Sequence, residues 1–296
     1  MLSHLPFSTV RDLFRYAVSR FNQAKLVYGQ GSMSAYDEAA YLILHTLHLP
    51  HDTLKPFFDA QLLNHEIDEV IRVIEQRIKE RLPASYITNE AWLHGYRFYV
   101  DKNVIIPRSF IGELIQQHFA PWVQDPDTVS SILDLCTGSG CLAILAADIF
   151  KNAHIDAVEI SSRALAIAQH NADMHACEKR ISFYEGDLYN PLPVQQYDII
   201  MANPPYVNTA SLRALPPEFQ HEPRLALAGG DDGMNIIRPI IAGAKEKLKP
   251  NGILVIEIGH ERMHLEAALG HLNYTWLTTS GGQDKVCLLE YRDLPA

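Results

Sequence analysis

The sequence predicts a doubly wound α/β fold with a smaller helical part in front of it, and three observations support this prediction. From residue 131 onward, short apolar runs alternate with amphipathic segments, which is typical of strands joined by helices in a mostly parallel sheet. One such run, 131–136, ends in a glycine-containing turn, and another, 197–202, ends in two prolines. Before residue 90, apolar residues recur instead at helical spacing.

Residues 1–90 are expected to form a helical domain. Ser8 or Thr9 is a candidate cap for the first helix, and Ser34 followed by Asp37 resembles a capping box before the second. Four isoleucines then follow helical spacing up to Pro83, which ends that helix: Ile67, Ile71, Ile74 and Ile78. The basic residues on the other side of this segment are expected to form a solvated face: Arg72, Arg77, Lys79 and Arg81.

Residues 91–106 alternate aromatic and polar residues around Gly95 and predict a hairpin linker, and residues 107–296 are expected to form the α/β domain. Strands are expected near 131–136, 154–160, 181–186, 197–203, 252–258, 273–279 and 285–291. Helices are expected near 110–120, 141–149, 161–175, 233–248 and 260–269.

Composition and charge narrow the class of protein. No apolar run approaches the roughly 18 residues of a membrane span, and the first ten residues lack the pattern of a secretory signal. The four cysteines have no regular spacing, which predicts reduced thiols and a cytoplasmic location. The formal net charge is −10, and from Ile105 onward the chain has 14 basic and 23 acidic residues. This acidic excess argues against a duplex nucleic acid as partner and suits a strongly basic protein.

The most informative local pattern is Asn203-Pro204-Pro205-Tyr206, directly after the apolar run 197–202. A residue before proline favours extended backbone, and proline has no N–H, so carbonyl oxygens dominate the polar backbone here. The side-chain oxygen of Asn203 and the carbonyl oxygen of Pro204 can each accept one hydrogen of a planar NH2 group, while Tyr206 lies against its flat face. An ordinary Pro-Pro turn, as at 216–217, is the alternative interpretation.

A second pattern lies about seventy residues upstream. The strand 131–136 contains Asp134 and leads into Thr137-Gly138-Ser139-Gly140, whose glycines let a ligand approach the start of a helix. Glu159 ends the next strand, where its carboxylate can accept both hydroxyls of a ribose, and Asp187 with Leu188 is placed to hold an adenine. The same spacing fits a dinucleotide site, so this loop alone indicates only a nucleoside cofactor.

Together these patterns resemble the class I S-adenosylmethionine-dependent methyltransferases, in the branch that modifies glutamine side-chain amides in translation proteins. The resemblance extends from about Trp92 to Lys285 and is carried by residues 103–109, 134–140, 203–206 and 215–230. Within the branch, Pro107-Arg108-Ser109 and His221-Glu222-Pro223 are more similar to the enzymes for large-subunit ribosomal protein number three than to the release-factor enzymes. Glu159 stands where many relatives carry aspartate.

The resemblance implies a seven-stranded mixed Rossmann-like sheet, S-adenosyl-L-methionine as cofactor, and a basic ribosomal protein as substrate selected by the helical domain. It implies catalytic roles for Asn203, Pro204, Pro205 and Tyr206. It implies cofactor binding by Pro107, Arg108, Asp134, Cys136, Thr137, Gly138, Ser139, Gly140, Glu159, Asp187, Leu188 and Asn203. No metal site, membrane or duplex nucleic acid is expected.

Three alternatives stay open at this point. The first is the sister activity on peptide chain release factors, and the second is methylation of an adenine amine in DNA or ribosomal RNA, since an Asn-Pro-Pro-aromatic edge serves that reaction too. The third is a cofactor-binding scaffold without catalysis. Two further motifs are interpreted as structural: residues 260–264 match a zinc-protease pattern but follow a strand directly, and Gly281-Gly282-Gln283 lies between two strands as a hairpin turn.

Overall fold

The computed structural model describes residues 7–295, so most of the segment considered for a secretory signal lies outside the described part. The chain forms two compact units. One contains the residues up to Glu90 together with Pro216–His221, and the other contains Ala91–Leu215 and the residues from Glu222 onward. The short segment Pro216–His221 therefore leaves the α/β part of the sequence and packs with the helical unit, which the sequence did not predict.

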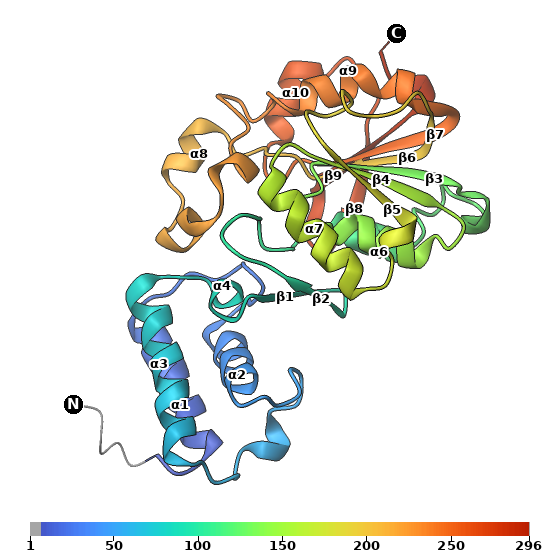
Figure 1. Ribbon diagram of the computed structural model, residues 1–296. Helices are drawn as coiled ribbons and strands as arrows, with labels where there is room; N and C mark the ends of the chain where they lie inside the picture. The colour runs from blue at the N-terminus through green and yellow to red at the C-terminus, as the bar shows by residue number, and fades with distance from the viewer. Residues whose placement is uncertain (1–6, 296) are drawn as a thin grey trace. The chain divides into compact units, whose positions relative to one another are not determined.

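The helical unit is built from α1 (Val10–Gln23), α2 (Ala35–Thr46), α3 (Asn64–Glu80) and the short α4 (Ala84–Thr88) (Figure 1). Thr9 caps α1 in a reciprocal capping box with Asp12, and the Ser34 hydroxyl accepts from the Asp37 backbone N–H at the start of α2. The first three helices enclose an apolar core of their own. The predicted caps and the helix around 67–78 are thereby confirmed.

The expectation of a solvated basic face on α3 is wrong for Arg77. This side chain is 1% exposed, and its Nε donates to Glu38 Oε1 at 2.7 Å in an ion pair that is buried on both sides. Glu218, also buried, accepts from Arg81 at 2.9 Å and from the Val27 N–H at 3.1 Å. Helical spacing alone could not reveal these carboxylates because they come from distant segments.

The second unit contains one mixed sheet of seven strands in the order β5-β4-β3-β6-β7-β9-β8. The strands are β3 (Ser131–Leu135), β4 (His154–Glu159), β5 (Ile181–Glu185), β6 (Tyr197–Ala202), β7 (Leu248–Glu257), β8 (Thr275–Thr279) and β9 (Gly282–Glu290). β3 to β7 pair in parallel, whereas β9 is antiparallel to both β7 and β8. The predicted α/β class and strand segments are confirmed.

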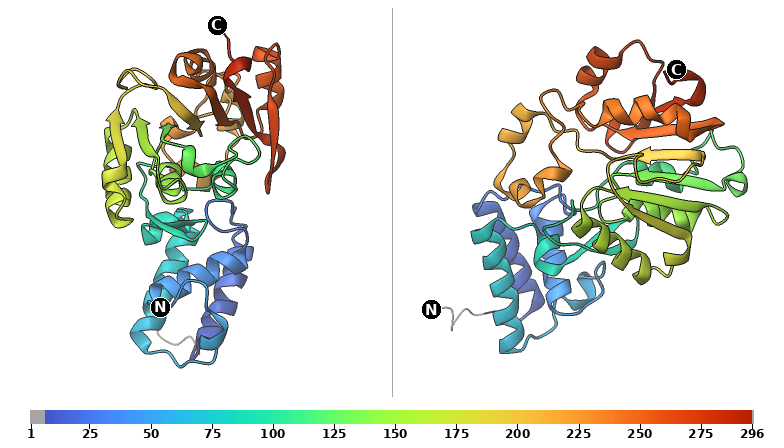
Figure 2. Two further views of the ribbon diagram at one scale, coloured as in Figure 1. Left: turned by 90° about the vertical axis from the view of Figure 1, so that its right-hand side faces the viewer. Right: turned by 45° about the horizontal axis from the view of Figure 1, so that its top comes forward.

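Helices cover both faces of this sheet (Figures 1 and 2). α6 (Cys141–Ile149) and α7 (Ser162–Met174) lie on one face, and α9 (Ile237–Lys247) and α10 (Arg262–Leu269) on the other. The two remaining helices of the unit are the short α5 (Ile111–Gln116) and α8 (Thr209–Arg213). The central strands are apolar on both faces, as expected for a parallel sheet covered on both sides.

A two-stranded hairpin opens this unit, with β1 (Glu90–Leu93) and β2 (Tyr96–Tyr99) joined at His94 and Gly95, both of which have positive φ. The helix predicted at 233–248 begins later, at Ile237, because Asp232 binds the Met234 N–H in a turn before it. In the described part of the chain, no helix is both long and apolar enough to span a membrane.

We expect Arg77→Ala to lower the free energy of unfolding of the helical unit by about 3–5 kcal/mol, because it leaves Glu38 buried without its partner. Urea unfolding followed by circular dichroism measures this change. Arg72→Ala is the matched control, since Arg72 is exposed on the same helix and should stay within about 0.5 kcal/mol of the wild type. Equal stability of both variants would show that the buried pair is dispensable.

Candidate active site

The candidate site lies at the carboxyl ends of β3 and β6, which are neighbours in the sheet although about sixty residues separate them in sequence. The chain runs from β3 outward to β4 and β5, and then returns to β6 on the other side of β3. The strand order reverses at this point, and ligands of doubly wound sheets bind there. Leu135 lies beside Ala202 in the register, so the glycine loop and residues 203–206 begin side by side.

Residues 203–206 follow β6 and belong to neither a helix nor a strand, in agreement with the prediction that the two prolines prevent a helix here. After Tyr206 the chain returns on itself: the Val207 N–H donates to the Leu227 carbonyl oxygen at 2.8 Å, and the Gly229 N–H donates to the Val207 carbonyl oxygen at 2.9 Å. This pairing closes the intervening loop next to the Asn-Pro-Pro-Tyr segment.

The glycine loop leaves β3 through Cys136, whose φ is +59°, and turns into α6 at Gly140. The Thr137 N–H donates to the Val158 carbonyl oxygen at 3.0 Å, which fixes the loop against β4. A side chain at Gly140 would lie 3.1 Å from the Cβ of Ala168 in α7, and φ is +79° there. Glycine is therefore required at this position both by conformation and by the close approach of α7.

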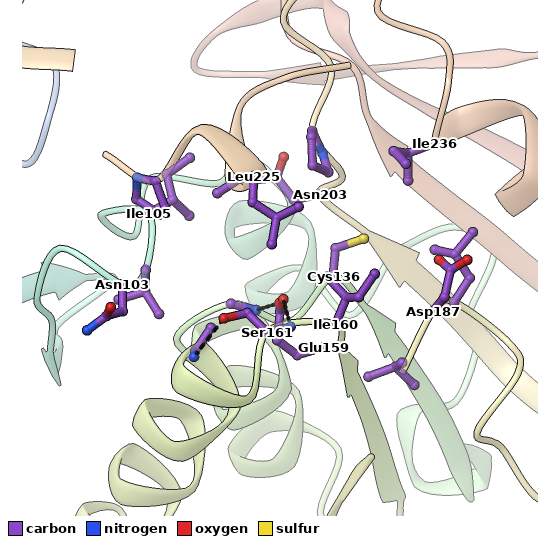
Figure 3. Close-up of a pocket in the computed structure, with 18 of the residues that line it drawn as sticks. Asn103, Ile105, Cys136, Glu159, Ile160, Ser161, Asp187, Asn203, Leu225 and Ile236 are labelled. Atoms are coloured by element: carbon purple, nitrogen blue, oxygen red, sulfur yellow. Dashed lines mark hydrogen bonds between the residues drawn. The ribbon is translucent and has the colours of Figure 1, made fainter. Parts of the chain in front are cut away.

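The loops at these strand ends line a recess of about 890 Å³, which includes space open to solvent. Figure 3 shows Asn203 across this main recess from Glu159, with Asp187 toward one end and Asn103 toward the other. Glu159 accepts from the Gly138 N–H at 2.9 Å and from the Ser161 N–H at 3.0 Å. Burial raises the pKa of Glu159, and these backbone donors oppose that effect.

A second, smaller recess adjoins the main one and shares Asn203 and Gly138 with it. Tyr206, Glu257 and Arg108 also line it. The Arg108 guanidinium forms two hydrogen bonds with Glu222, at 2.5 and 2.8 Å. Glu222 also accepts from the Ile106 N–H at 3.1 Å, so this buried carboxylate ties residues 106–108 to the segment that follows it.

The structure gathers most of the residues that the sequence singled out. Seven of them line the main recess: Cys136, Gly138, Glu159, Asp187, Leu188, Asn203 and Pro205. Five more line the second recess: Pro107, Arg108, Thr137, Ser139 and Tyr206. Three lie at the same strand ends without lining either recess: Asp134, Gly140 and Pro204.

The sequence reasoning assigned no role to one wall of the main recess or to two buried carboxylates. The wall comes from the hairpin exit and from the loop after the prolines: Asn103, Val104, Ile105, Pro223, Leu225 and Ala226. The carboxylates are Glu222 and Glu257. The wall residues belong to the stretches that carry the family resemblance, which is the signal that could have identified them.

The carboxylates at this site fit the chemical groups of S-adenosylmethionine. Asp134 Oδ1 is buried and has no hydrogen-bond partner, whereas Oδ2 accepts from the Thr137 hydroxyl at 2.5 Å. An unpartnered carboxylate oxygen beside the glycine loop suits a cationic ligand. Glu159 keeps lone pairs for ribose hydroxyls beyond its two backbone donors, and Asp187 is exposed at the far end of the recess.

A family model described as the methyltransferase small domain matches residues 116–218. A ribosomal protein uL3 glutamine methyltransferase of Burkholderia pseudomallei is 58% identical to this chain, over 99% of this chain and 98% of the relative. Proteins of the same name from Bordetella pertussis and Francisella tularensis are 54% and 40% identical, over 97% of this chain and over 96% and 91% of their own lengths.

The sheet order, the glycine loop and the Asn-Pro-Pro-Tyr edge define a class I methyltransferase that uses S-adenosylmethionine. The identity with these relatives extends over nearly the whole chain, helical unit included. The chain belongs to the ribosomal protein uL3 glutamine methyltransferase family. The resemblance inferred from the sequence is confirmed.

The stability of the donor-free protein should depend on the ionisation of Asp134. Burial raises the pKa of Asp134 from 3.8 to about 7, so the folded state holds this proton at a pH where the unfolded state has lost it. The protonated Asp134 carboxyl stabilises the folded state fully below about pH 4, and this stabilisation is lost as the pH rises toward 7. Asp134→Asn should therefore show a smaller change in unfolding free energy across this range.

Urea unfolding at a series of pH values measures this difference. Asp127→Asn is the control, because Asp127 is exposed and its removal should leave the pH dependence of the wild type unchanged. Parallel curves for Asp134→Asn and the wild type would contradict the burial of an acid with a raised pKa at this position.

The affinity for the donor should depend on Glu159. Glu159→Ala removes the carboxylate that faces the main recess and should weaken donor binding about 10- to 100-fold, the range for lost hydrogen bonds to a charged group. Isothermal calorimetry measures the affinity. The control is Glu185→Ala, because Glu185 pairs with Glu159 in the strand register but is exposed and lines neither recess. Equal affinity for both variants would remove Glu159 from the donor site.

Proposed function

We propose that this protein transfers a methyl group from S-adenosyl-L-methionine to the side-chain amide nitrogen of a glutamine in ribosomal protein uL3. The observation that carries the proposal is the Asn203-to-Tyr206 edge beside the glycine loop, in a chain 58% identical to a relative of that activity. A planar carboxamide and an edge built from acceptor oxygens are complementary.

The chemical difficulty lies with the acceptor, because an amide nitrogen shares its lone pair with the adjacent carbonyl. When bound, the donor supplies an electrophilic methyl carbon. Asn203 Oδ1 accepts one amide hydrogen and the Pro204 carbonyl oxygen accepts the other, so the nitrogen lone pair turns away from both toward the methyl carbon. Tyr206 holds the plane of the carboxamide.

Orientation and electrostatics supply the rate enhancement in this proposal. The enzyme aligns the nitrogen, the methyl carbon and the leaving sulfur, and such alignment lowers the activation free energy by several kcal/mol. The two acceptor oxygens also stabilise the positive charge that develops on nitrogen. The methylated amide is then acidic enough to lose its extra proton to water, so the reaction needs no dedicated base.

The main recess holds the donor in this proposal. Among the described residues that line the main recess, none is aromatic. Its walls include the aliphatic and proline side chains of Ile105, Pro223 and Leu225. The aromatic ring at the acceptor is therefore Tyr206, which lines the second recess.

The charge of the chain supports a basic protein as the substrate. Residues from Ile105 onward carry 23 acidic and 14 basic side chains, and ribosomal proteins that contact RNA are basic. Opposite charges raise the rate of encounter between two proteins. We assign selection of this protein to the helical unit, and the proposed substrate places the reaction in the cytoplasm.

Asn203→Ala should lower turnover by about 100- to 1000-fold, because the acceptor oxygen acts mainly in the transition state. Affinity for the donor should change far less. Transfer of labelled methyl groups to purified uL3, with mass spectrometry of the product, measures both rate and site. Asn190→Ala is the control, since Asn190 is exposed outside both recesses.

Two results would contradict this proposal. Unchanged turnover in Asn203→Ala would remove that side chain from the chemistry. Methylation of a release factor or of RNA by the wild type, with uL3 left unlabelled, would assign the activity to a different substrate.

A further inference from the structure

Tyr206 is seated between three glycines of two neighbouring loops. A Cβ on Gly229 would lie 2.7 Å from the Tyr206 Cα, and a Cβ on Gly233 would overlap the Tyr206 carbonyl oxygen. A Cβ on Gly259 would overlap the edge of the Tyr206 ring. These residues therefore approach both the backbone and the ring as closely as glycine allows, which leaves the Tyr206 ring little freedom to move sideways.

Glu257 lies at the end of this ring. It is the last residue of β7, two residues before Gly259, and is 3% exposed. Glu257 Oε2 accepts from the Ser109 hydroxyl at 2.6 Å and from the Phe110 N–H at 2.9 Å. Glu257 and Tyr206 line the same second recess. The charge of Glu257 raises the pKa of the Tyr206 hydroxyl, in addition to the larger effect of burial.

The surroundings of Glu257 contain few compensating charges. Arg108 is the one cation that lowers the pKa of this carboxyl, and its guanidinium is held by Glu222. Among the described residues, the Cys141 thiol and the Tyr206 hydroxyl are titratable groups whose pKa values Glu257 raises. Burial dominates and raises the pKa of Glu257 from 4.5 to about 7, against the donors Ser109 and Phe110.

We propose that Glu257 is a positioning residue for methyl transfer, which holds the Tyr206 hydroxyl and thereby fixes the ring against the acceptor carboxamide. This inference rests on the proposed function, because it requires that Tyr206 orient the acceptor. Glu257 and Asn203 line the same second recess, so the carboxylate lies at the chemical end of the site without touching the acceptor itself.

An ionised carboxylate accepts from all three donors around it, whereas a protonated one gives an oxygen lone pair to its own proton. Protonation of Glu257 therefore weakens its proposed interaction with the Tyr206 hydroxyl. Since the pKa of Glu257 is about 7, turnover at saturating donor should fall on the acid side of neutrality. Saturation with the donor separates this effect from the titration of Asp134, whose pKa is also about 7.

The test is Glu257→Gln, which keeps the shape and one acceptor oxygen but removes the charge. We expect kcat on the protein acceptor to fall about 10- to 100-fold, the range for a small misplacement of a reacting group, and the acid limb near pH 7 to disappear. Donor affinity should stay within about twofold of the wild type. Glu246→Gln, an exposed residue of α9, is the control for loss of one charge.

Tyr206→Phe removes the hydroxyl that Glu257 holds and keeps the ring. It should lower kcat to a similar extent, and the double variant should be no slower than the slower single variant, because both changes break one interaction. Ser109→Ala, which removes one support of Glu257, provides a milder variant if Glu257→Gln fails to fold.

An NMR measurement that does not depend on enzyme activity separates this inference from the proposed function. With 13C-labelled tyrosine, the Tyr206 ring signal, assigned through Tyr206→Phe, should titrate near pH 7 in the wild type and not in Glu257→Gln. Unchanged kcat in Glu257→Gln, additive effects in the double variant, or a Tyr206 signal indifferent to Glu257 would each overturn the inference. Failure of the wild type to methylate uL3 would overturn the proposed function alone.

Discussion

The parallel pairing of β3 with β6 is the constraint on which the site depends. These strands are far apart in sequence, and their pairing places the glycine loop next to the Asn-Pro-Pro-Tyr segment. If β6 paired elsewhere, the donor loop and the acceptor edge would belong to different parts of the sheet. Main-chain hydrogen bonds and the buried apolar side chains of both strands fix this register, so the buried centre of the sheet determines the geometry of the site.

Four buried carboxylates gather at this site. Asp134, Glu159, Glu222 and Glu257 are each at most 9% exposed, although burial of an acid opposes its ionisation. Three are held by donors from another segment: Glu159 by Gly138, Glu222 by Arg108, and Glu257 by Ser109. Asp134 is held by Thr137, three residues further along the chain. Glu159, Glu222 and Glu257 therefore cross-link segments that lie far apart in the sequence.

The sequence predicts the positions of the helices and strands better than it predicts which distant residues they contact. Strands such as 197–202 are short apolar runs between polar turns, and that pattern is local, so β6 lies where it was expected. Arg77 was assigned to a solvated face, because helical spacing cannot reveal Glu38, which lies 39 residues away along the chain. For the same reason, nothing in the sequence of Pro216–His221 indicated that it packs with the helical unit.

The candidate site shows the same division between local and long-range information. Asn203 and Gly138 were recognised because their residue types and neighbours carry the chemistry within a few positions of sequence. Glu257 was not, since a single acid at the end of an apolar strand has no distinctive spacing. Its importance emerges only when β7 lies beside β6, so that the end of one strand supports the tyrosine that follows the other. Residues that contact the ligands can thus be recognised from local sequence motifs. Residues that hold those motifs in place can be recognised only from the order and pairing of the strands.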